Sequence, residues 1–401
     1  MTKAASERPR RRMTLVGIAM AGMTLAASLP TRTAAAGPEA PGKPVIGATL
    51  GAAAPGHDTQ EETERGQPLP PGAIEFVIPF TETGGSARWA NFYARMLSEA
   101  LDDPPRQVLV RYRPGGGSTL GANWFSAQAG RGADLLFGTS AQTQFSYLLG
   151  DPRAQYDYAG WRPLLASGTG GLIYGNAALA RAFAADPTIL REVPVRYGAV
   201  SATGLDLLAL LALDLLGVQI TDPFKFESRA ETRRAFLDGD TDLDFQTVPA
   251  FQRQTGGRKG TRGNALMTFG TLEANGEIGR DPLLPEVPTV LEICDALPEC
   301  TPDGAGWDAW RAFLIGGLAA QKMLFAPEDA PTEVIEEYEA AFAAMVAEDD
   351  FEAKAFEAID PYPQLAGADA QTALDAITEL TPEARVFVRD WLEQRYGVII
   401  E

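Results

Sequence analysis

The chain has 401 residues, enough to bury one large hydrophobic core or two ordinary ones. Hydrophobic residues make up 45% of it and charged residues 22%, a balance typical of a globular protein. Its formal net charge of −19 at pH 7 opposes binding to nucleic acid and to anionic lipid, so neither is an expected partner.

An export signal is predicted at residues 1–36. Arg10–Arg12 precede an uncharged run from Met13 to Thr31, and Ala34–Ala36 offer a small-residue cleavage site. The twin arginine favours the folded-protein export route; the alternative is a Sec signal with extra arginines, because Met13 stands where the twin-arginine motif prefers Phe. Removing this segment, with its six basic residues and one acidic residue, would change the net charge to −24. We expect a periplasmic protein whose residues 37–71 form a disordered linker.

Two residue types limit the chemistry that the chain can perform. The one histidine, His57, lies in the predicted linker, so the folded body has no histidine for a Ser-His-Asp triad or a metal cage. Cys294 and Cys300 are separated by five residues, and they either form a disulfide or remain two thiols. Two cysteines are too few for a zinc site, and no Walker A or GxSxG sequence is present. We therefore expect no cofactor and no metal.

Predicted strands and helices alternate from Gly72 onward. Short apolar runs rich in β-branched and aromatic residues predict strands, and apolar residues at steps of three and four predict helices with one buried face. The first half has strands at 73–80, 107–112 and 133–140, separated by helices from Trp89 to Ala100 and at 121–129. This alternation predicts a parallel sheet flanked by helices.

The middle of the chain repeats the pattern. Strands are predicted at 193–200 and 241–248, and helices at 206–216 and 229–239. The apolar run at 206–216 is too short to cross a bilayer, so it predicts a buried helix. Two amphipathic helices follow, at 331–348 and 381–397. Tandem α/β units followed by helices predict two lobes.

Glycine-rich loops follow several predicted strands, RPGGGST (113–119) most prominently. A dinucleotide-binding fingerprint is not favoured, because the third glycine of GxGxxG falls one residue late, at Gly121, and Asp134 lies at the start of the next strand. The loop is either a structural turn or one of several ligand-binding loops at the carboxyl edge of the sheet. The other loops at that edge are TETGGS (81–86), GTSAQT (138–143), SATG (201–204) and FQTV (245–248). Helix N-termini and glycines there suit a carboxylate.

Five segments, taken in order, resemble those of the periplasmic solute-binding proteins of tripartite tricarboxylate transporters, often called Bug proteins. The resemblance covers about residues 73–360. The segments are FVIPFTETGGSARWANFYARMLSEAL (76–101), RYRPGGGSTLGAN (111–123), LLFGTS (135–140), DGDTDLDFQTVPA (238–250) and LLPEVPTVLEI (283–293).

The resemblance implies an α/β, two-lobed, type II-like periplasmic-binding fold in which each lobe is a sheet flanked by helices. Lobe 1 would comprise residues 72–172 and 303–401, and lobe 2 residues 173–302. The lobes would close over a small carboxylate, and the protein, acting as a monomer, would deliver it to the membrane subunits of a tripartite tricarboxylate-type transporter.

The resemblance also implies a set of ligand-binding residues, with RPGGGST mainly structural. From lobe 1 these are Phe80, Thr81, Gly84, Gly85 and Ser86 of the first loop, with Thr139 and Ser140 beside it, and from lobe 2 they are Ser201, Thr203, Gly204, Gln246 and Thr247. Ala87 stands where the family usually has an Asp, which makes an amino-acid ligand less expected.

Arg88 is a further candidate, because an anionic ligand in a strongly acidic protein would gain from a local cation. Either Arg88 contacts a second ligand carboxylate, or it faces solvent and pairs with Glu82. The alternative to a binding protein is an exported carboxylate-dependent hydrolase. A hydrolase would need paired acids, and Asp242 and Asp244 are the only close pair near the ligand edge.

Overall fold

The computed structural model describes residues 68–400, apart from positions 129, 222, 224, 257–262, 274–276, 356–358 and 360. The predicted export signal and the linker up to residue 67 lie outside the described residues. Within the described part of the chain, no helix combines the length and the apolar character needed to cross a bilayer.

The first sheet has six strands in the order β13-β4-β12-β3-β1-β2. The strands are β1 (Ile74–Ile78), β2 (Val108–Tyr112), β3 (Leu135–Gly138), β4 (Arg162–Ser167), β12 (Lys322–Ala326) and β13 (Gln364–Ala366). The neighbours β2, β1 and β3 run parallel, as the sequence predicted. β12 runs antiparallel to β3 and β4, and β13 runs antiparallel to β4, so the sheet as a whole is mixed.

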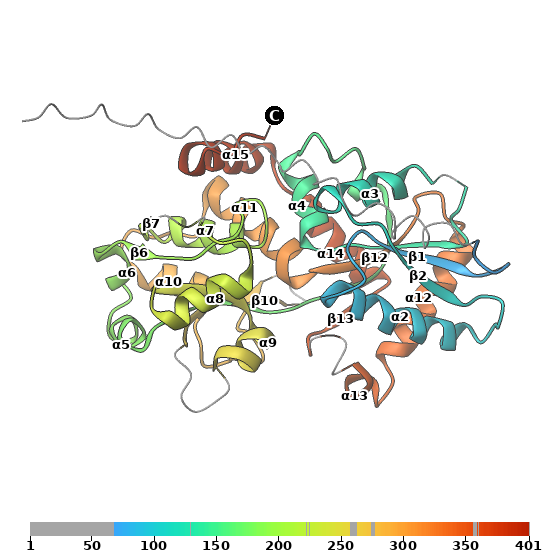
Figure 1. The fold of residues 1–401 in the computed structure, drawn as a ribbon, viewed down its shortest axis with the longest axis horizontal. Helices are drawn as coiled ribbons and strands as arrows, with labels where there is room; N and C mark the ends of the chain where they lie inside the picture. Colours follow the sequence, from blue (N-terminus) through green and yellow to red (C-terminus); the bar gives the residue numbers. More distant parts are fainter. Residues whose placement is uncertain are drawn as a thin grey trace, which may run out of the picture. The chain divides into compact units, whose positions relative to one another are not determined.

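Helices cover both faces of this sheet (Figure 1). On one face, α2 (Gly85–Leu101) and α12 (Thr332–Val346) pack against Phe76, and on the other, α3 (Thr119–Ser126) and α4 (Ala141–Leu149) pack against Val77. Successive strand residues point to opposite faces, so a strand buried on both faces is apolar throughout. This explains why β1 is apolar apart from Glu75, which is buried and pairs with Arg131 at 2.8 Å.

The second sheet has three strands, in the order β8-β5-β9, and all are antiparallel. Its strands are β5 (Gly171–Gly175), β8 (Leu243–Thr247) and β9 (Asn264–Thr268). The short parallel pair β6 (Val195–Arg196) and β7 (Ile220–Thr221) is joined to it by a parallel bridge between Tyr197 and Leu243. The two strands predicted in this region, at 193–200 and 241–248, contain β6 and β8 and run parallel to each other, whereas β5 and β9, which run antiparallel to each other, were not predicted from the sequence.

Helices also cover the second sheet. The remaining helices are α5 (Ala177–Ala185), α6 (Ile189–Glu192), α7 (Asp206–Leu215), α8 (Arg229–Asp238), α9 (Val248–Phe251), α10 (Val290–Ala296), α11 (Gly304–Leu314), α13 (Phe351–Ala355), α14 (Ala368–Thr378) and α15 (Pro382–Tyr396). The predicted helix at 206–216 is confirmed as α7, and Leu207–Leu213 are fully buried. α11 packs against α7 and α15, and Trp391 of α15 donates a hydrogen bond to Asp214 of α7 at 2.8 Å.

Three chain segments meet where the sheets connect. Residues 168–170 lead from β4 into β5, and Thr169 N–H donates to the Leu318 carbonyl at 2.8 Å. Tyr362, just before β13, donates its hydroxyl to the buried Asp281 carboxylate at 3.0–3.1 Å. A Cβ atom on Gly170 would lie 1.8 Å from Asp281 Oδ2, so this position has room for glycine only.

Candidate functional site

The loops that follow β1, β2 and β3 meet at one edge of the first sheet. These three strands are parallel neighbours, so TETGGS, RPGGGST and GTSAQT all leave from their carboxyl ends. β6, which a parallel bridge links to the second sheet, runs in the same direction as β8, and SATG and FQTV lie at the carboxyl ends of these two strands. Ligands of such folds bind beyond the carboxyl ends of parallel strands. The loop set selected from the sequence is therefore placed at the sheet edges where a ligand is expected.

The TETGGS loop is open to solvent. Thr81, Gly84 and Gly85 are exposed, and Phe80 and Ser86 are half-buried. Gly84 has φ +102° and caps α2, which begins at Gly85 without a side-chain capping hydrogen bond. A Cβ atom on either Gly84 or Gly85 would meet nothing within 4 Å. The start of α2 is thus exposed and unpacked at Gly84 and Gly85, and the first N–H groups of a helix are suited to bind an anion.

Arg88 lies in the first turn of α2 and is exposed. Its predicted alternative role, an ion pair with Glu82, does not occur, since Arg88 forms no ion pair within the described part of the chain. A cation at this end of a helix opposes the helix dipole, so nothing in the helix itself favours Arg88 there.

The GTSAQT loop has two buried threonines, Thr139 and Thr143. Thr139 is buried, and its Oγ1 lies 3.3 Å from the Tyr158 hydroxyl and 3.4 Å from the Met323 carbonyl oxygen. Ser140, half-buried, precedes α4, and its N–H donates to Thr143 Oγ1 at 3.4 Å. Thr139 therefore packs lobe 1 together, whereas Ser140 stays at the sheet edge.

The RPGGGST loop has an unusual backbone. Four successive residues, Gly115, Gly116, Gly117 and Ser118, have positive φ angles between +60° and +131°. Glycine adopts this conformation at little cost, and Ser118 is the one residue with a side chain that does so. The glycines allow the turn from β2 into α3, in agreement with the structural role implied by the sequence.

The SATG loop is fixed by hydrogen bonds. Ser201 Oγ accepts from Thr203 N–H and lies the same distance, 3.3 Å, from Thr203 Oγ1. Asp206, the first residue of α7, accepts from the N–H groups of Val200 at 2.8 Å and Ser201 at 3.3 Å. Gly204 is buried. The Asp206 carboxylate and the Ser201 hydroxyl, as acceptors of backbone N–H groups, hold this loop in shape.

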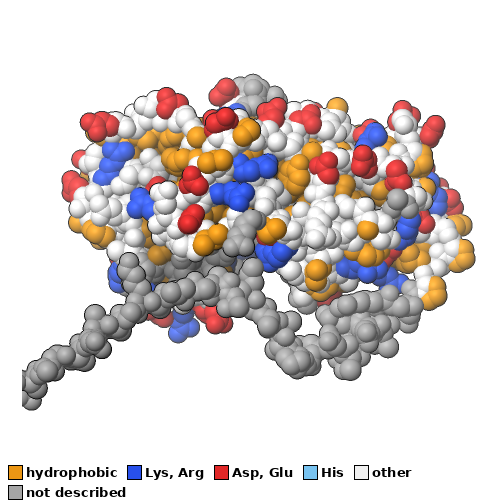
Figure 2. Space-filling model, turned by 90° about the horizontal axis from the view of Figure 1, so that it is seen from above, with side chains coloured by type: hydrophobic (Ala, Val, Ile, Leu, Met, Phe, Trp, Pro, Cys, Tyr) orange, Lys and Arg blue, Asp and Glu red, His pale blue; other side chains and the backbone are white. Residues whose placement is uncertain are grey.

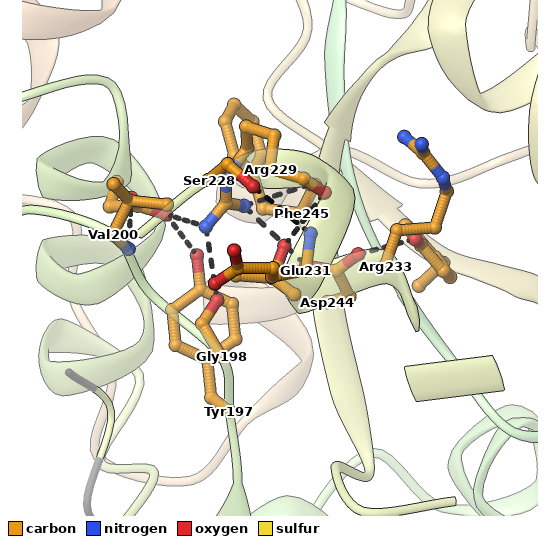
Figure 3. Close-up of polar contacts among 12 residues, drawn as sticks. Tyr197, Gly198, Val200, Ser228, Arg229, Glu231, Arg233, Asp244 and Phe245 are labelled. Carbon is orange, nitrogen blue, oxygen red and sulfur yellow. Dashed lines mark hydrogen bonds and ion pairs between the residues drawn. The ribbon is translucent and has the colours of Figure 1, made fainter. Parts of the chain in front are cut away.

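A buried ionic cluster stands behind the SATG loop (Figure 3). Arg229, the first residue of α8, lies 2.6 Å from Asp206 Oδ1 and 3.4 Å from Asp244 Oδ1, and it also donates to the carbonyls of Gly198 and Phe245. Burial raises the pKa of both carboxyl groups, and the charge of Arg229 opposes that rise. The Arg229 guanidinium is paired with these acceptors, so it positions the loop and is not available to bind an anionic ligand.

Hydroxyl groups complete the cluster. Tyr197 donates to Asp206 at 3.1 Å, and Tyr174 donates to Asp244 at 2.5 Å. Both tyrosines are almost fully buried, and burial raises the pKa of Tyr197. Asp244 is therefore a structural carboxylate. Asp242 lies just before β8 and pairs with Arg196 at 2.7 Å, which holds the pKa of this carboxyl below its usual value.

Loops of the two sheets approach each other at Gln142. Gln142 is the second residue of α4 and is half-buried. Its Oε1 lies 3.6 Å from the position that a Cβ atom on Gly204 would take, and its Nε2 lies 3.7 Å from the corresponding position on Gly117. The GTSAQT side chain thus reaches both SATG and RPGGGST.

The remaining predicted positions lie on β8 and around α10. Gln246 is buried, and its Nε2 has no hydrogen-bond partner among the described residues. Thr247 is half-buried and precedes α9. Cys294 and Cys300 are joined in a disulfide. Within the ranges that the structure describes, no group of three or more His, Cys, Asp or Glu side chains could hold a metal ion.

Charges of both signs share the surface. On the face drawn in Figure 2, acidic and basic side chains are interspersed, and the basic ones form no continuous stripe. Together with the net charge of −19, this distribution gives nucleic acid no extended basic surface on that face.

The comparisons with known proteins concern the fold. No protein-family model matches the chain, and no curated protein matches it in sequence. A TctC solute-binding protein from Polaromonas, solved without ligand, superposes with a TM-score of 0.58 at 14% identity, over 80% of this chain and 98% of that one. The chain has the two-lobed fold of the TctC solute-binding proteins. The periplasmic binding protein BugD superposes with a TM-score of 0.50 at 17% identity, over 82% and 98% of the two chains.

A third structure, a protein of R. palustris with adipate, has a TM-score of 0.53 at 19% identity, over 82% of this chain and 98% of that one. The two-lobed TctC-like fold predicted from five sequence segments is thus confirmed. Sequence reasoning missed Gln142, Asp206 and Arg229. Asp206 is the first residue of an apolar segment and Arg229 is the first residue of a polar one. Nothing in either segment predicts that these two side chains form a buried ion pair.

Proposed function

We propose that the chain is an extracytoplasmic solute-binding protein that holds a small carboxylate between its two lobes and delivers it to the membrane subunits of a tripartite tricarboxylate-type transporter. The observation that carries this proposal is the exposed N-terminus of α2 at Gly84 and Gly85, in a TctC-like fold. The protein would act in the periplasm, as a monomer and without a cofactor.

A carboxylate fits the chemistry of this edge. Helix N–H groups and the hydroxyls of Thr81, Ser86, Ser201 and Thr203 are neutral donors, which bind a carboxylate without proton transfer. The R. palustris structure with the same fold contains adipate, a carboxylate. The proposed ligand contacts are the residues predicted from the sequence, including Gln246 and Thr247 of β8. Thr139 would act indirectly, by packing beneath the loop.

The hydrolase alternative has little support from the side chains. Asp242 pairs with the exposed Arg196, and Asp244 pairs with Arg229 and Tyr174 inside lobe 2. Catalysis by two carboxylates needs both groups free to face one substrate. These two face different partners, so we propose binding rather than turnover.

A thermal-shift screen of purified protein against mono-, di- and tricarboxylates tests the proposal. We expect at least one carboxylate to raise the melting temperature, since a ligand that binds only the native state stabilises it. Small-angle scattering with that ligand should show a smaller radius of gyration if the lobes close on it. An unchanged melting temperature across the screen, or consumption of the ligand, would contradict the proposed function.

A further inference from the structure

Gln142 belongs to lobe 1, and its side chain lies close to lobe 2, so it is placed to contact a ligand bound between the lobes. Its amide lies between two glycines, Gly117 and Gly204, which belong to loops of different sheets. Neither glycine has a side chain that could pair with the amide. The polar group of Gln142 is therefore bordered by bare backbone on both sides.

The amide of Gln142 is unpaired although it is half-buried. Among the residues that the structure describes, no hydrogen bond to its side chain occurs. Gln144, two residues further along α4, differs: it is fully buried and its Nε2 donates to the Ala320 carbonyl at 2.8 Å. The amide atoms of Gln142 are not among the buried unpaired atoms, so a ligand can reach them and form the hydrogen bonds that the described residues do not supply.

We propose that Gln142 contacts the ligand and selects carboxylates that carry a second hydrogen-bonding group, either another carboxylate or a hydroxyl. This inference rests on the proposed function, in which the first carboxylate binds at Gly84 and Gly85. The TETGGS and GTSAQT loops follow the neighbouring strands β1 and β3, which are about 5 Å apart. A ligand that spans these two adjacent loops would present its second group to Gln142.

A neutral amide is suited to this selection. Its NH₂ group donates to a carboxylate, and either end of the amide can pair with a hydroxyl. It adds no charge to a protein that is already strongly acidic. Because Gln142 also reaches SATG, a ligand group bound to it would lie against both lobes, which favours the closed arrangement.

The test uses three ligands that share a four-carbon chain: butyrate, 3-hydroxybutyrate and succinate. Calorimetry would compare the parent with Gln142→Ala, Gln142→Glu and the control Gln128→Ala. Gln128 is another half-buried glutamine of lobe 1, whose Nε2 donates to the Trp124 carbonyl at 3.0 Å. Melting temperatures of all four proteins would establish that each one folds.

We expect the parent to bind succinate at least tenfold more tightly than butyrate, with 3-hydroxybutyrate between them. Gln142→Ala should reduce that preference at least fivefold, mainly by weakening succinate, and Gln142→Glu should weaken succinate further through like-charge repulsion. Gln128→Ala should leave the preference unchanged. If the parent shows no preference, or if Gln142→Ala keeps it within twofold, the assignment of Gln142 is wrong. If the parent binds none of the three ligands nor any carboxylate of the thermal-shift screen, the proposed function itself fails, and this assignment with it.

Discussion

The TETGGS and SATG loops occupy corresponding edges of the two lobes but are held in different ways. TETGGS is exposed, and its side-chain contacts are two 3.5 Å approaches of the Thr81 hydroxyl to Thr83. SATG is tied to Asp206 through two backbone N–H groups, and Asp206 is tied to Arg229. The second loop is therefore formed before a ligand arrives, whereas the first has room to adjust around it.

This difference assigns different tasks to the two loops. A preformed loop spends little conformational entropy on binding, because its backbone is already ordered. An open loop with glycines lets a ligand approach the backbone directly. Loss of the buried cluster should thus damage folding and binding together, while changes in TETGGS that keep the Gly84 backbone conformation should affect mainly binding.

The largest effect is expected for Asp206→Ala. It leaves Arg229 without its closest partner and removes the acceptor for two loop N–H groups, and breaking a buried ion pair typically costs about 3–5 kcal/mol. We expect the lower end, about 3 kcal/mol. The Arg229 side chain is 30% exposed to solvent, so water can partly replace the lost partner. Urea denaturation measures the change in the free energy of unfolding.

Asp242→Ala is the control for this variant, since Asp242 pairs with Arg196 at the surface of the same lobe. Exposed ion pairs contribute about 1 kcal/mol or less. Equal losses in the two variants would show that SATG is no more firmly fixed than the surrounding surface.

The next largest effect is expected for Gly85→Val. The new side chain meets no protein atom at its Cβ, and the Gly85 backbone is not among those with positive φ, so the melting temperature should stay within a few degrees of the parent. Carboxylate affinity should fall at least tenfold, about 1.4 kcal/mol, because the side chain enters the space where the ligand would approach.

Gly84→Ala provides the contrast, because φ +102° strains any residue with a Cβ atom and should lower stability by about 1 kcal/mol. Calorimetry and thermal unfolding of both variants separate the two effects. A Gly85→Val protein that binds as well as the parent would remove TETGGS from the site.

The smallest effect is expected at Asp281, which lies where the two sheets connect. It tests whether buried polar contacts also fix the chain at this connection. Burial raises the pKa of Asp281, so the folded state holds its proton to higher pH than the unfolded state does. Its contribution to stability is thus fully present below the unfolded pKa of about 3.9 and is lost as pH rises through the folded pKa.

Asp281→Asn removes this titration and keeps an oxygen acceptor for Tyr362. We expect the variant to melt at a higher temperature than the parent at pH 7, with a difference that shrinks on acidification towards pH 4. Thermal unfolding between pH 4 and 8 measures it. A pH-independent difference would mean that the Asp281 carboxyl does not titrate in this range.

Much of lobe 1 could be predicted from the sequence, because its first strands are apolar on both faces and its helices have one buried face. The residues at 73–80, 107–112 and 133–140 became β1, β2 and β3 as expected. In lobe 2, the strands β6 and β8 were predicted, but β5 and β9 were not, because periodicity reports only which residues are buried and not how the chain passes from lobe 1 into β5.

The candidate site shows the same division. Glycines and hydroxyls after strands mark a ligand edge in the sequence, and the structure puts these loops there. Arg229 could not be identified in advance, because the helix that it begins, RAETRRAFLD, is as polar as a solvent-facing helix. Its burial arises from Asp206 and Asp244, which lie 23 residues before and 15 residues after it.

The empty space around Gly84 and Gly85 also bears on how the ligand range of such a protein could change over generations. Substitutions at residues 81–86 alter the surface offered to the ligand without disturbing a packed neighbour, so most of them should leave a folded protein on which selection can act. A randomised library confined to this hexapeptide would therefore sample new ligands, whereas one directed at Asp206 and Arg229 would mostly sample unfolded chains.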